Sequence, residues 1–235
     1  VHGNFFNGYL AVQIKARLGV PVVVSLHINP DVDLRGRTPW WPDWKSRLFL
    51  ARLRAFEDET LKRADWVLPV YEPIRSYAER HGARHIEVCY NALHPDHLRK
   101  KETYALNRPA RIISVGRQFA EKNPDNLIRA LARLPDAELT LVGDGSHHNY
   151  LRQVAQETGV GPRVVFHRAI PNDQLCQMLP DFDIFATHTE YWEISKSVLE
   201  GLLTGLPMVL NRRLGDPVPE YEGDFLLLVE NTPEA

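Results

Sequence analysis

The segment WEISKSVLEGLLTGLP, residues 192–207, decides the predicted fold because it lies between two apolar runs. FDIFATHT (182–189) precedes it and MVLN (208–211) follows it, and both runs have the length of a strand. Within the segment, apolar side chains recur at helical spacing and a Gly-Leu-Pro turn follows them. The sequence therefore predicts a βαβ unit whose helix begins at the carboxyl edge of a parallel sheet, where ligands bind.

Glu200 is the residue of this helix whose role is least determined by the pattern. SVLE (197–200) fits a capping box, in which the Glu only accepts a hydrogen bond from a backbone N–H, and Lys196 is placed to pair with it. A helix N-terminus is also a site for phosphate, and Glu200 would then lie beside a bound ligand. Spacing alone favours the capping box.

The rest of the chain alternates strand-like and helix-like patterns. Such alternation predicts parallel sheets with helices on both faces, which is an α/β fold. A polar, aperiodic stretch at 93–108 is predicted to be a linker between two domains, 1–92 and 109–235. The other predicted strands are residues 20–28, 64–71, 84–91, 111–116, 137–145 and 163–170, and the other predicted helices are residues 5–18, 72–82, 123–134, 148–158 and 172–179.

Composition excludes several classes of protein. Residues 1–107 carry 16 Lys and Arg against 12 Asp and Glu, whereas residues 108–235 carry 12 against 18, which argues against a nucleic-acid-binding protein. No run approaches the roughly 18 apolar residues of a membrane span, and no signal-peptide pattern opens the chain. Cys89 and Cys176 are too few for a disulfide framework or a zinc cluster, so we expect a reducing cytoplasm.

A cluster of tryptophans lies in the loop before residue 45. Trp40, Trp41 and Trp44 precede a helix that alternates Lys and Arg with Leu and Phe over residues 45–54. Tryptophans beside basic residues are typical of a peripheral contact with a membrane surface. The alternative, in which the tryptophans pack under the loop and the charges are solvated, is equally compatible with the sequence.

The carboxyl ends of the predicted strands carry glycines and cations. Gly116-Arg117, Gly143-Asp144-Gly145 and His167-Arg168 each follow a strand, and Lys122 comes shortly after the first of these pairs. Glycines permit a close approach of the backbone, and the cations suit a pyrophosphate. Neither the G-x-G-x-x-G nor the G-x-x-x-x-G-K-[ST] motif occurs, so neither a dinucleotide fingerprint nor a P-loop is indicated.

Four segments in this order resemble a known family. SVGRQFAEKNPDNLIRALARL (114–134), LTLVGDG (139–145), VVFHRAIPNDQLCQMLPDFDIFATHTE (164–190) and ISKSVLEGLLTGLPMVL (194–210) look like the nucleotide-sugar-binding half of a GT-B fold glycosyltransferase of family 4, the glycosyl transferases group 1. Residues 64–93 are similar to the end of the family's acceptor domain. The resemblance implies two Rossmann-like parallel-sheet domains, with the N-terminal domain incomplete and the C-terminal domain lacking its last helices.

The resemblance also implies roles for individual residues. Arg117 and Lys122 match the pair that holds the donor diphosphate, and Glu200 matches the second Glu of an E-x7-E motif, which binds the ribose. The first Glu of that motif would fall at Trp192, so Glu193 or Glu190 is its nearest substitute. The complete expected site comprises His27, Arg117 and Lys122 as catalytic residues, and Gly116, Gly143, Arg168, Glu193, Ile194, Ser195, Lys196, Ser197 and Glu200 beside them for donor binding.

The expected function is that of a retaining glycosyltransferase that moves a hexose from a nucleoside diphosphate sugar, with UDP or GDP, to a hydroxyl of a glycan or lipid-linked glycan. The resemblance implies no metal and no other cofactor, because cations and the helix N-terminus stabilise the leaving diphosphate. We expect a cytoplasmic protein at the inner membrane face, and an inactive or poorly active chain as a fragment. The alternatives are a non-catalytic protein that binds a sugar nucleotide or a partner, and a sugar-nucleotide epimerase or a phosphorylase on the same fold.

Overall fold

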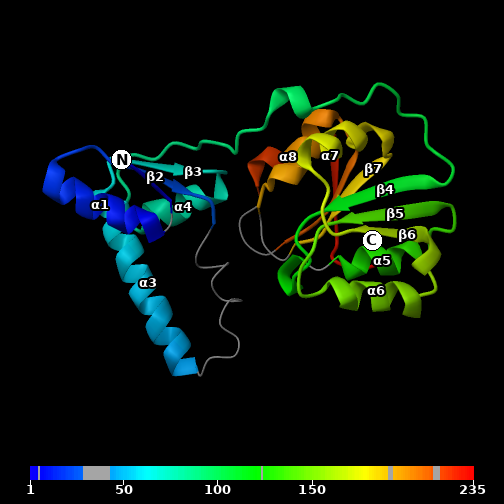
Figure 1. The fold of residues 1–235 in the computed structure, drawn as a ribbon, viewed down its shortest axis with the longest axis horizontal. Coiled ribbons are helices and arrows are strands. Elements are labelled where there is room, and N and C mark those ends of the chain that lie inside the picture. Colours follow the sequence, from blue (N-terminus) through cyan, green and yellow to red (C-terminus); the bar gives the residue numbers. More distant parts are fainter. Residues whose placement is uncertain (5, 29–42, 123, 190–192, 214–217) are drawn as a thin grey trace. The chain divides into compact units, whose positions relative to one another are not determined.

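The computed structural model describes residues 1–4, 6–28, 43–122, 124–189, 193–213 and 218–235 (Figure 1). The chain forms two compact units, Val1–Asn91 and Ala92–Ala235. Each unit contains a parallel β-sheet with helices packed on it, so the predicted α/β class with two Rossmann-like domains is confirmed. Trp40, Trp41, Glu190 and Trp192 lie outside the described residues.

Unit 1 is built on a three-stranded parallel sheet in the order β1-β2-β3. The central strand β2 comes from the apolar run VPVVVSLHI, which is typical of a strand buried on both faces of a sheet. It pairs with β1 along one edge and with β3 along the other. The strands are β1 (His2–Asn4), β2 (Val23–Leu26) and β3 (Trp66–Pro69), and the helices are α1 (Phe6–Leu18), α3 (Asp43–Arg63) and α4 (Pro73–Arg80).

The structure differs from the sequence prediction at two places in unit 1. The strand β1 was not predicted, because HGN lacks the β-branched residues that mark a strand. The prediction of a strand at 84–91 is wrong in extent: only one isolated bridge, between Val67 and Ile86, forms there. Glu87 and Cys89 donate N–H bonds to β3, but Pro69 has no N–H to return, so the ladder stops.

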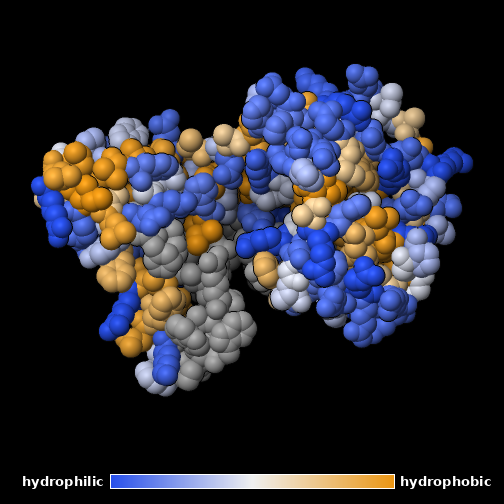
Figure 2. Space-filling view, viewed as in Figure 1, coloured by the Kyte–Doolittle hydropathy of each residue, from blue (hydrophilic) through white to orange (hydrophobic). Residues whose placement is uncertain are grey.

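Hydrophobic side chains gather on the surface of α1 and α3 (Figure 2). Leu10 and Leu18 of α1 are 60% and 70% exposed, and Trp44 and Leu48 at the start of α3 are 63% and 51% exposed. Within the described residues, no helix combines the length and the apolar character needed to cross a membrane.

Unit 2 contains a six-stranded parallel sheet in the order β6-β5-β4-β7-β8-β9. The chain builds outward from β4 to β6 and then returns to the other side of β4 with β7, so the strand order reverses between β4 and β7. The strands are β4 (Ala110–Val115), β5 (Ala137–Val142), β6 (Val164–His167), β7 (Ile184–Thr187), β8 (Met208–Asn211) and β9 (Leu226–Val229). The helices are α5 (Asp125–Leu131), α6 (His148–Glu157), α7 (Asn172–Met178) and α8 (Lys196–Thr204).

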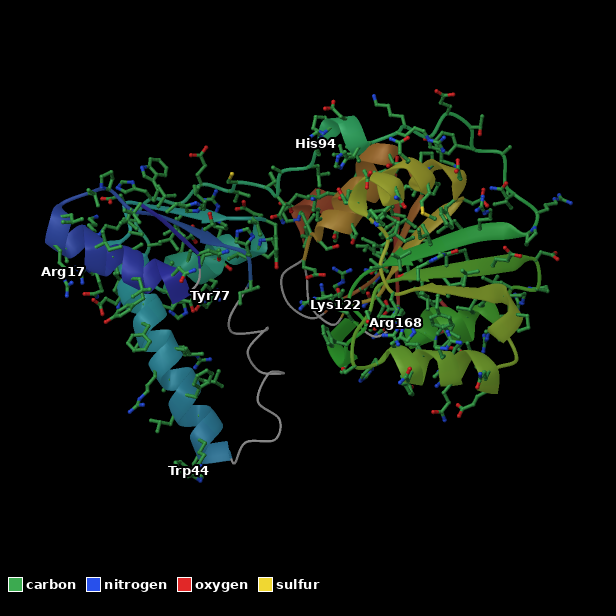
Figure 3. The ribbon with its side chains drawn as sticks, in the orientation of Figure 1. Arg17, Trp44, Tyr77, His94, Lys122 and Arg168 are labelled. Atoms are coloured by element: carbon green, nitrogen blue, oxygen red, sulfur yellow. The ribbon has the colours of Figure 1, made fainter. Side chains whose placement is uncertain are left out.

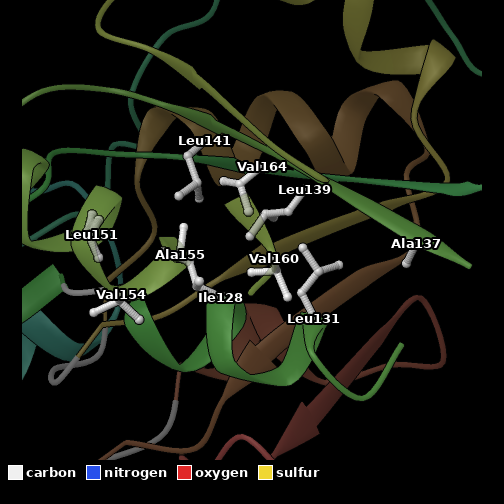
Figure 4. Close-up of a cluster of buried hydrophobic side chains, with 10 residues drawn as sticks. All are labelled: Ile128, Leu131, Ala137, Leu139, Leu141, Leu151, Val154, Ala155, Val160 and Val164. Carbon is white, nitrogen blue, oxygen red and sulfur yellow. The ribbon is translucent and has the colours of Figure 1, made fainter. Parts of the chain in front are cut away.

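A cluster of apolar side chains holds α5 and α6 against one face of this sheet (Figure 4). Leu139 and Leu141 lie two positions apart in β5, so their side chains point to the same face of the sheet. Each of them is 1% exposed. The members of the cluster are Ile128, Leu131, Ala137, Leu139, Leu141, Leu151, Val154, Ala155, Val160 and Val164.

The segment that follows Asn91 lies along unit 2. The backbone N–H of Lys101 donates to the carbonyl of Thr204 at 2.8 Å, and its ammonium donates to the carbonyls of Pro180 and Phe182. Asn107 donates its backbone N–H and its side-chain amide to the carboxylate of Asp183. Residues 93–108, predicted to be a linker, therefore include a stretch that is hydrogen-bonded to the rest of unit 2.

Candidate functional site

A pocket opens at the carboxyl edge of the six-stranded sheet, where the strand order reverses. The loop after β4 forms one side of the pocket, and the segment that leads into α8 forms the other. Crevices at this position are the usual ligand sites of open α/β sheets. Six of the residues expected from the sequence line it, namely Gly116, Arg117, Lys122, Glu193, Ser195 and Ser197.

Lys122 and Glu193 form an ion pair inside this pocket. The ammonium lies 2.6 Å from Oε1 of Glu193, and the two side chains are 13% and 15% exposed. Lys122 ends a short 3-10 helix (Ala120–Lys122) that the loop after β4 forms, and it is labelled in Figure 3. Low exposure strengthens the attraction between the charges, so each group fixes the position of the other.

The backbone of Glu193 is held as well. Its carbonyl accepts hydrogen bonds from the hydroxyl of Tyr221 at 2.7 Å and from the guanidinium of Arg213 at 3.3 Å. Burial raises the pKa of Tyr221 far above its ordinary value, so this hydroxyl remains a donor. Glu193 thus enters the pocket from a backbone position that two other segments of the unit define.

The helix α8 begins with Ser195 as its N-cap, and Ser195 Oγ accepts the N–H of Val198 at 3.3 Å. The alternative interpretation of SVLE as a capping box is therefore wrong, because Ser197 lies inside the helix. Ser197 Oγ instead donates to the carbonyl of Val115 at 3.0 Å, which ties the start of α8 to the end of β4. The free N–H groups of the first turn lie beside the pocket.

Glu200 lies within α8 and is only 3% exposed. Its Oε1 accepts a hydrogen bond from the side-chain amide of Asn172 at 2.8 Å, and Asn172 is the first residue of α7. A carboxylate this deeply buried requires donors around it, and Asn172 supplies one. Glu200 is not among the residues that line the pocket, nor are Ile194 and Lys196.

Gly143 and Arg168 follow strands β5 and β6, as the sequence indicates, and each contacts another part of unit 2. A Cβ at Gly143 would lie 1.9 Å from the carbonyl oxygen of Gly116, so this glycine is needed for the contact between two loops. Arg168 makes two 2.8 Å contacts with the carboxylate of Asp144, and its side chain is 61% exposed (Figure 3). Neither residue lines the pocket.

Arg117 and His27 are both exposed. The guanidinium of Arg117 lies 5.3 Å from the centre of the Phe119 ring, which orients it at the rim of the pocket. His27 follows β2 and belongs to unit 1, whereas the pocket belongs to unit 2.

A buried pair that the sequence did not indicate supports the loop after β4. Gln118 and His148 are 2% and 5% exposed, and Gln118 Oε1 lies 2.7 Å from Nδ1 of His148. Burial lowers the pKa of His148, with Arg168 contributing in the same direction, so the neutral ring donates to the amide oxygen. The pair fixes the loop that presents Arg117.

Hydrogen bonds keep the carboxylate of Asp144 ionised. The N–H of Gly145, and then the guanidinium of Arg168, hold the pKa of Asp144 below its ordinary value. The described residues contain no group of three or more His, Cys, Asp or Glu that could hold a metal ion.

The sequence missed Asn172, Gln118, His148 and Tyr221. Each of them is polar, and its partner is 28 to 30 positions away along the chain. Gln118 follows a predicted strand, and Asn172 and His148 begin predicted helices, but exposed polar residues occupy such positions as well. Tyr221 lies in no predicted element.

Two Rossmann-like parallel-sheet units, one of them with a pocket where its strand order reverses, define an α/β protein of the GT-B type. Residues 97–234 match the family described as Glycosyl transferases group 1, and residues 1–93 match the Glycosyl transferase 4-like domain. The chain belongs to this glycosyltransferase family.

Curated and solved relatives agree with this assignment. The chain is 31% identical over 145 residues to a GDP-mannose-dependent alpha-(1-6)-phosphatidylinositol monomannoside mannosyltransferase of Mycolicibacterium smegmatis, which covers 57% of this chain and 38% of the relative. Sucrose-phosphate synthase of Thermosynechococcus elongatus superposes with a TM-score of 0.76 at 18% identity, over 100% of this chain and 61% of that one. Anabaena HepE, solved with UDP and glucose, gives 0.72 at 18% identity, over 97% and 64%. The chain thus spans less than two thirds of the length of each of these relatives.

Proposed function

We propose that this chain carries the donor site of a retaining glycosyltransferase, which moves a hexose from a nucleoside diphosphate sugar to a hydroxyl of a glycan or lipid-linked glycan. The observation that carries the proposal is the pocket at the β4–β7 switch point, where Lys122, Arg117 and the start of α8 converge. Membership of the glycosyltransferase family supports a sugar nucleotide as the ligand of this pocket.

The diphosphate is the part of the donor that this pocket suits. Lys122 and Arg117 supply positive charge, and the first-turn N–H groups of α8 add hydrogen-bond donors. These groups are fixed before a ligand arrives, so they can stabilise the negative charge that develops on a departing diphosphate. We therefore propose that transfer needs neither a metal ion nor another cofactor.

The sugar would be bound by the segment that precedes α8. Glu193 lies in the pocket one position after the place of the family's first motif Glu, and it is held by Lys122, Tyr221 and Arg213. We propose that Glu193 contacts the hexose and that Glu200 accepts a hydrogen bond from the ribose. This proposal assigns no contact with the donor to His27, Gly143 or Arg168, because none of them lines the pocket.

A titration tests the donor site directly. We expect UDP or GDP to bind the chain, and Arg117→Ala and Glu200→Ala to weaken that binding about tenfold or more, because each removes a charged hydrogen-bonding partner. EDTA should leave the affinity unchanged. Isothermal titration calorimetry provides the measurement, with Arg133→Ala as a control because Arg133 is exposed and pairs with Glu234. Equal affinities in all variants would remove the donor-site proposal.

A test of the retaining mechanism requires an acceptor as well as the donor. We expect the product to keep the anomeric configuration of the donor, which the NMR coupling constant of the anomeric proton reports. A protein that binds the nucleotide but transfers nothing to any hydroxyl acceptor would support the non-catalytic alternative.

The start of α3 suits contact with an anionic membrane surface, which we propose as the location of the acceptor, on the cytoplasmic side. Exposed apolar residues recur there at positions i, i+4, i+7 and i+11, and exposed cations lie on both sides of this stripe. The stripe consists of Trp44, Leu48, Ala51 and Ala55, and the flanking cations are Lys45, Arg47, Arg52 and Arg54.

Sedimentation with vesicles tests this surface. We expect the chain to bind vesicles that contain phosphatidylglycerol and not vesicles of phosphatidylcholine alone, and Leu48→Glu to abolish that binding. Leu10→Glu is the matched control, because Leu10 is similarly exposed but lies on α1. An equal loss in both variants, or no binding to the anionic vesicles, would contradict the assignment.

A further inference from the structure

Three side chains in unit 2 form a continuous hydrogen-bonded chain that ends at Glu200. His97 Nδ1 lies 3.2 Å from Oδ1 of Asn172, and Asn172 Nδ2 donates to Oε1 of Glu200 at 2.8 Å. The three residues come from a 3-10 helix (Pro95–His97), from α7 and from α8. His97 lies in the segment predicted to be a linker, and Asn172 lies in the family-like segment 164–190, but the resemblance assigns no role to either residue.

The direction of each hydrogen bond is determined by Glu200. A carboxylate can only accept, so Asn172 must turn its NH2 group toward Glu200 and its oxygen toward His97. His97 must then donate from Nδ1, as the Nδ1–H tautomer or as the imidazolium. His97 therefore selects the one orientation of the Asn172 amide that suits Glu200.

The imidazole of His97 is itself held in place. Its ring stacks on that of His94 with centroids 4.3 Å apart and an interplanar angle of 14°. The carbonyl of His97 accepts a hydrogen bond from Gln177 of α7 at 3.0 Å. The donor at Nδ1 is thus presented to Asn172 by a segment that is anchored to the same helix.

This arrangement determines what Glu200 can still bind. Asn172 occupies Oε1, and among the described residues no partner bonds to Oε2. The side chain is 3% exposed, and Oε2 keeps its capacity to accept a hydrogen bond from a donor that reaches it. A ribose hydroxyl would be such a donor.

We propose that Asn172 and His97 are positioning residues that hold Glu200 so that a single carboxylate oxygen accepts a hydroxyl of the ribose, which makes the site select ribonucleotides. This inference rests on the proposed donor site. It assigns to the site a discrimination between ribose and its deoxy analogues, and it traces that discrimination to two side chains that do not touch the ligand.

Binding of UDP or GDP, whichever binds more tightly, is compared with binding of its 2′,3′-dideoxy analogue by calorimetry on the full chain. We expect the wild-type chain to bind the analogue about tenfold or more weakly. Asn172→Ala should reduce that ratio to within about twofold, by weakening the ribonucleotide and leaving the analogue unchanged. A residue that only supports the fold would weaken both ligands by the same factor.

Two further variants keep the test sharp. His97→Leu should lower the ratio as Asn172→Ala does, whereas His97→Gln, which retains an N–H donor, should restore it. Asn126→Ala is the matched control, because Asn126 is an Asn of α5 whose side-chain amide bonds, within the described part of the chain, to Asn231 alone. Failure of the wild-type chain to bind either nucleotide would overturn the donor site and this inference together, whereas nucleotide binding with an unchanged ratio in Asn172→Ala would overturn this inference alone.

Discussion

Two ion pairs at the carboxyl edge of the six-stranded sheet differ mainly in burial. Lys122 and Glu193 are 13% and 15% exposed, whereas Arg168 and Asp144 are 61% and 48% exposed. The sequence places both cations after strands of one sheet and gives no reason to rank them. Attraction between charges is weakened by water, so only the first pair should fix the shape of the site. Position at the edge of a sheet thus predicts which residues gather there, and burial decides which of their ion pairs can fix the shape of the site.

Lys122→Ala should have the largest effect of the series, and it tests directly whether the less exposed ion pair stabilises the fold. The substitution leaves the carboxylate of Glu193 buried without its cation, so we expect the free energy of unfolding to fall by about 3 kcal/mol. Urea unfolding followed by circular dichroism gives the value. The double variant Lys122→Ala, Glu193→Gln should recover part of the loss, because no buried charge remains. If the free energy of unfolding fell no more than it does when an exposed lysine is replaced by alanine, the ion pair of Lys122 and Glu193 would not stabilise the fold.

Asp183 is a buried carboxylate of unit 2 that forms no ion pair with the described residues, so it extends the comparison. Asp183 is 6% exposed and accepts N–H groups of Arg111 and Asn107. In Asp183→Asn an NH2 group would face a backbone N–H, so we expect a loss of about 2 kcal/mol in the free energy of unfolding. The same urea titration measures it, and Asp136→Asn, at an exposed position in the same unit, is the control. Equal stability of the two variants would contradict the importance of burial.

The pH dependence of stability provides a related test. Burial alone raises the pKa of Asp183, but hydrogen bonds from the N–H groups of Arg111 and Asn107 outweigh it and hold the pKa below its ordinary value. A lowered folded-state pKa stabilises the fold above the unfolded-state pKa of about 3.9, and the contribution is lost as the pH falls through the folded-state pKa. We expect the urea concentration at the unfolding midpoint to decrease when the pH is lowered below about 4. This decrease should be smaller in Asp183→Asn, which lacks the carboxylate. Parallel pH curves for the two proteins would refute the assignment.

Arg168→Ala should give the smallest effect of the series. Its partner Asp144 is exposed, and exposed pairs lose most of their attraction to solvent and to side-chain entropy. We expect the midpoint of thermal unfolding to move by less than about 2 °C, with nucleotide affinity unchanged. Differential scanning calorimetry and the nucleotide titration measure the two quantities. A loss of affinity comparable with that of Arg117→Ala would return Arg168 to the donor site.

The order of elements could be predicted because buried parallel strands have an unmistakable composition. Runs such as VPVVVSLHI and RIISVG combine β-branched residues with no polar alternation, and helical patterns separate them. Strand ends were less predictable, since β5 stops at Val142 where Gly143 and Gly145 adopt positive φ angles. The failure at 84–91 came from Pro69 on the neighbouring strand, which no property of residues 84–91 reveals.

The candidate site was predictable as a place and less so as a set of contacts. Parallel strands present their carboxyl ends at one edge, so Gly116, Lys122 and Ser197 meet there as expected. The pairing of Lys122 with Glu193 spans 71 positions and depends on side-chain conformations that a linear pattern does not specify. Gly143 was expected to allow a ligand to approach the backbone. In the structure the carbonyl of Gly116, in the loop after β4, occupies that space. The absence of a side chain permits either approach.

The hydrogen bonds of Lys101 bear on how unit 2 can be prepared in isolation. A truncated variant that starts at residue 109 would leave the carbonyls of Thr204, Pro180 and Phe182 without their donor and would expose the surface that the preceding segment covers. A variant that starts at Ala92 would keep all of these bonds. Recombinant expression of the unit should therefore succeed from the earlier start and yield aggregates from the later one, and trypsin should cleave slowly after Lys101 in the intact protein.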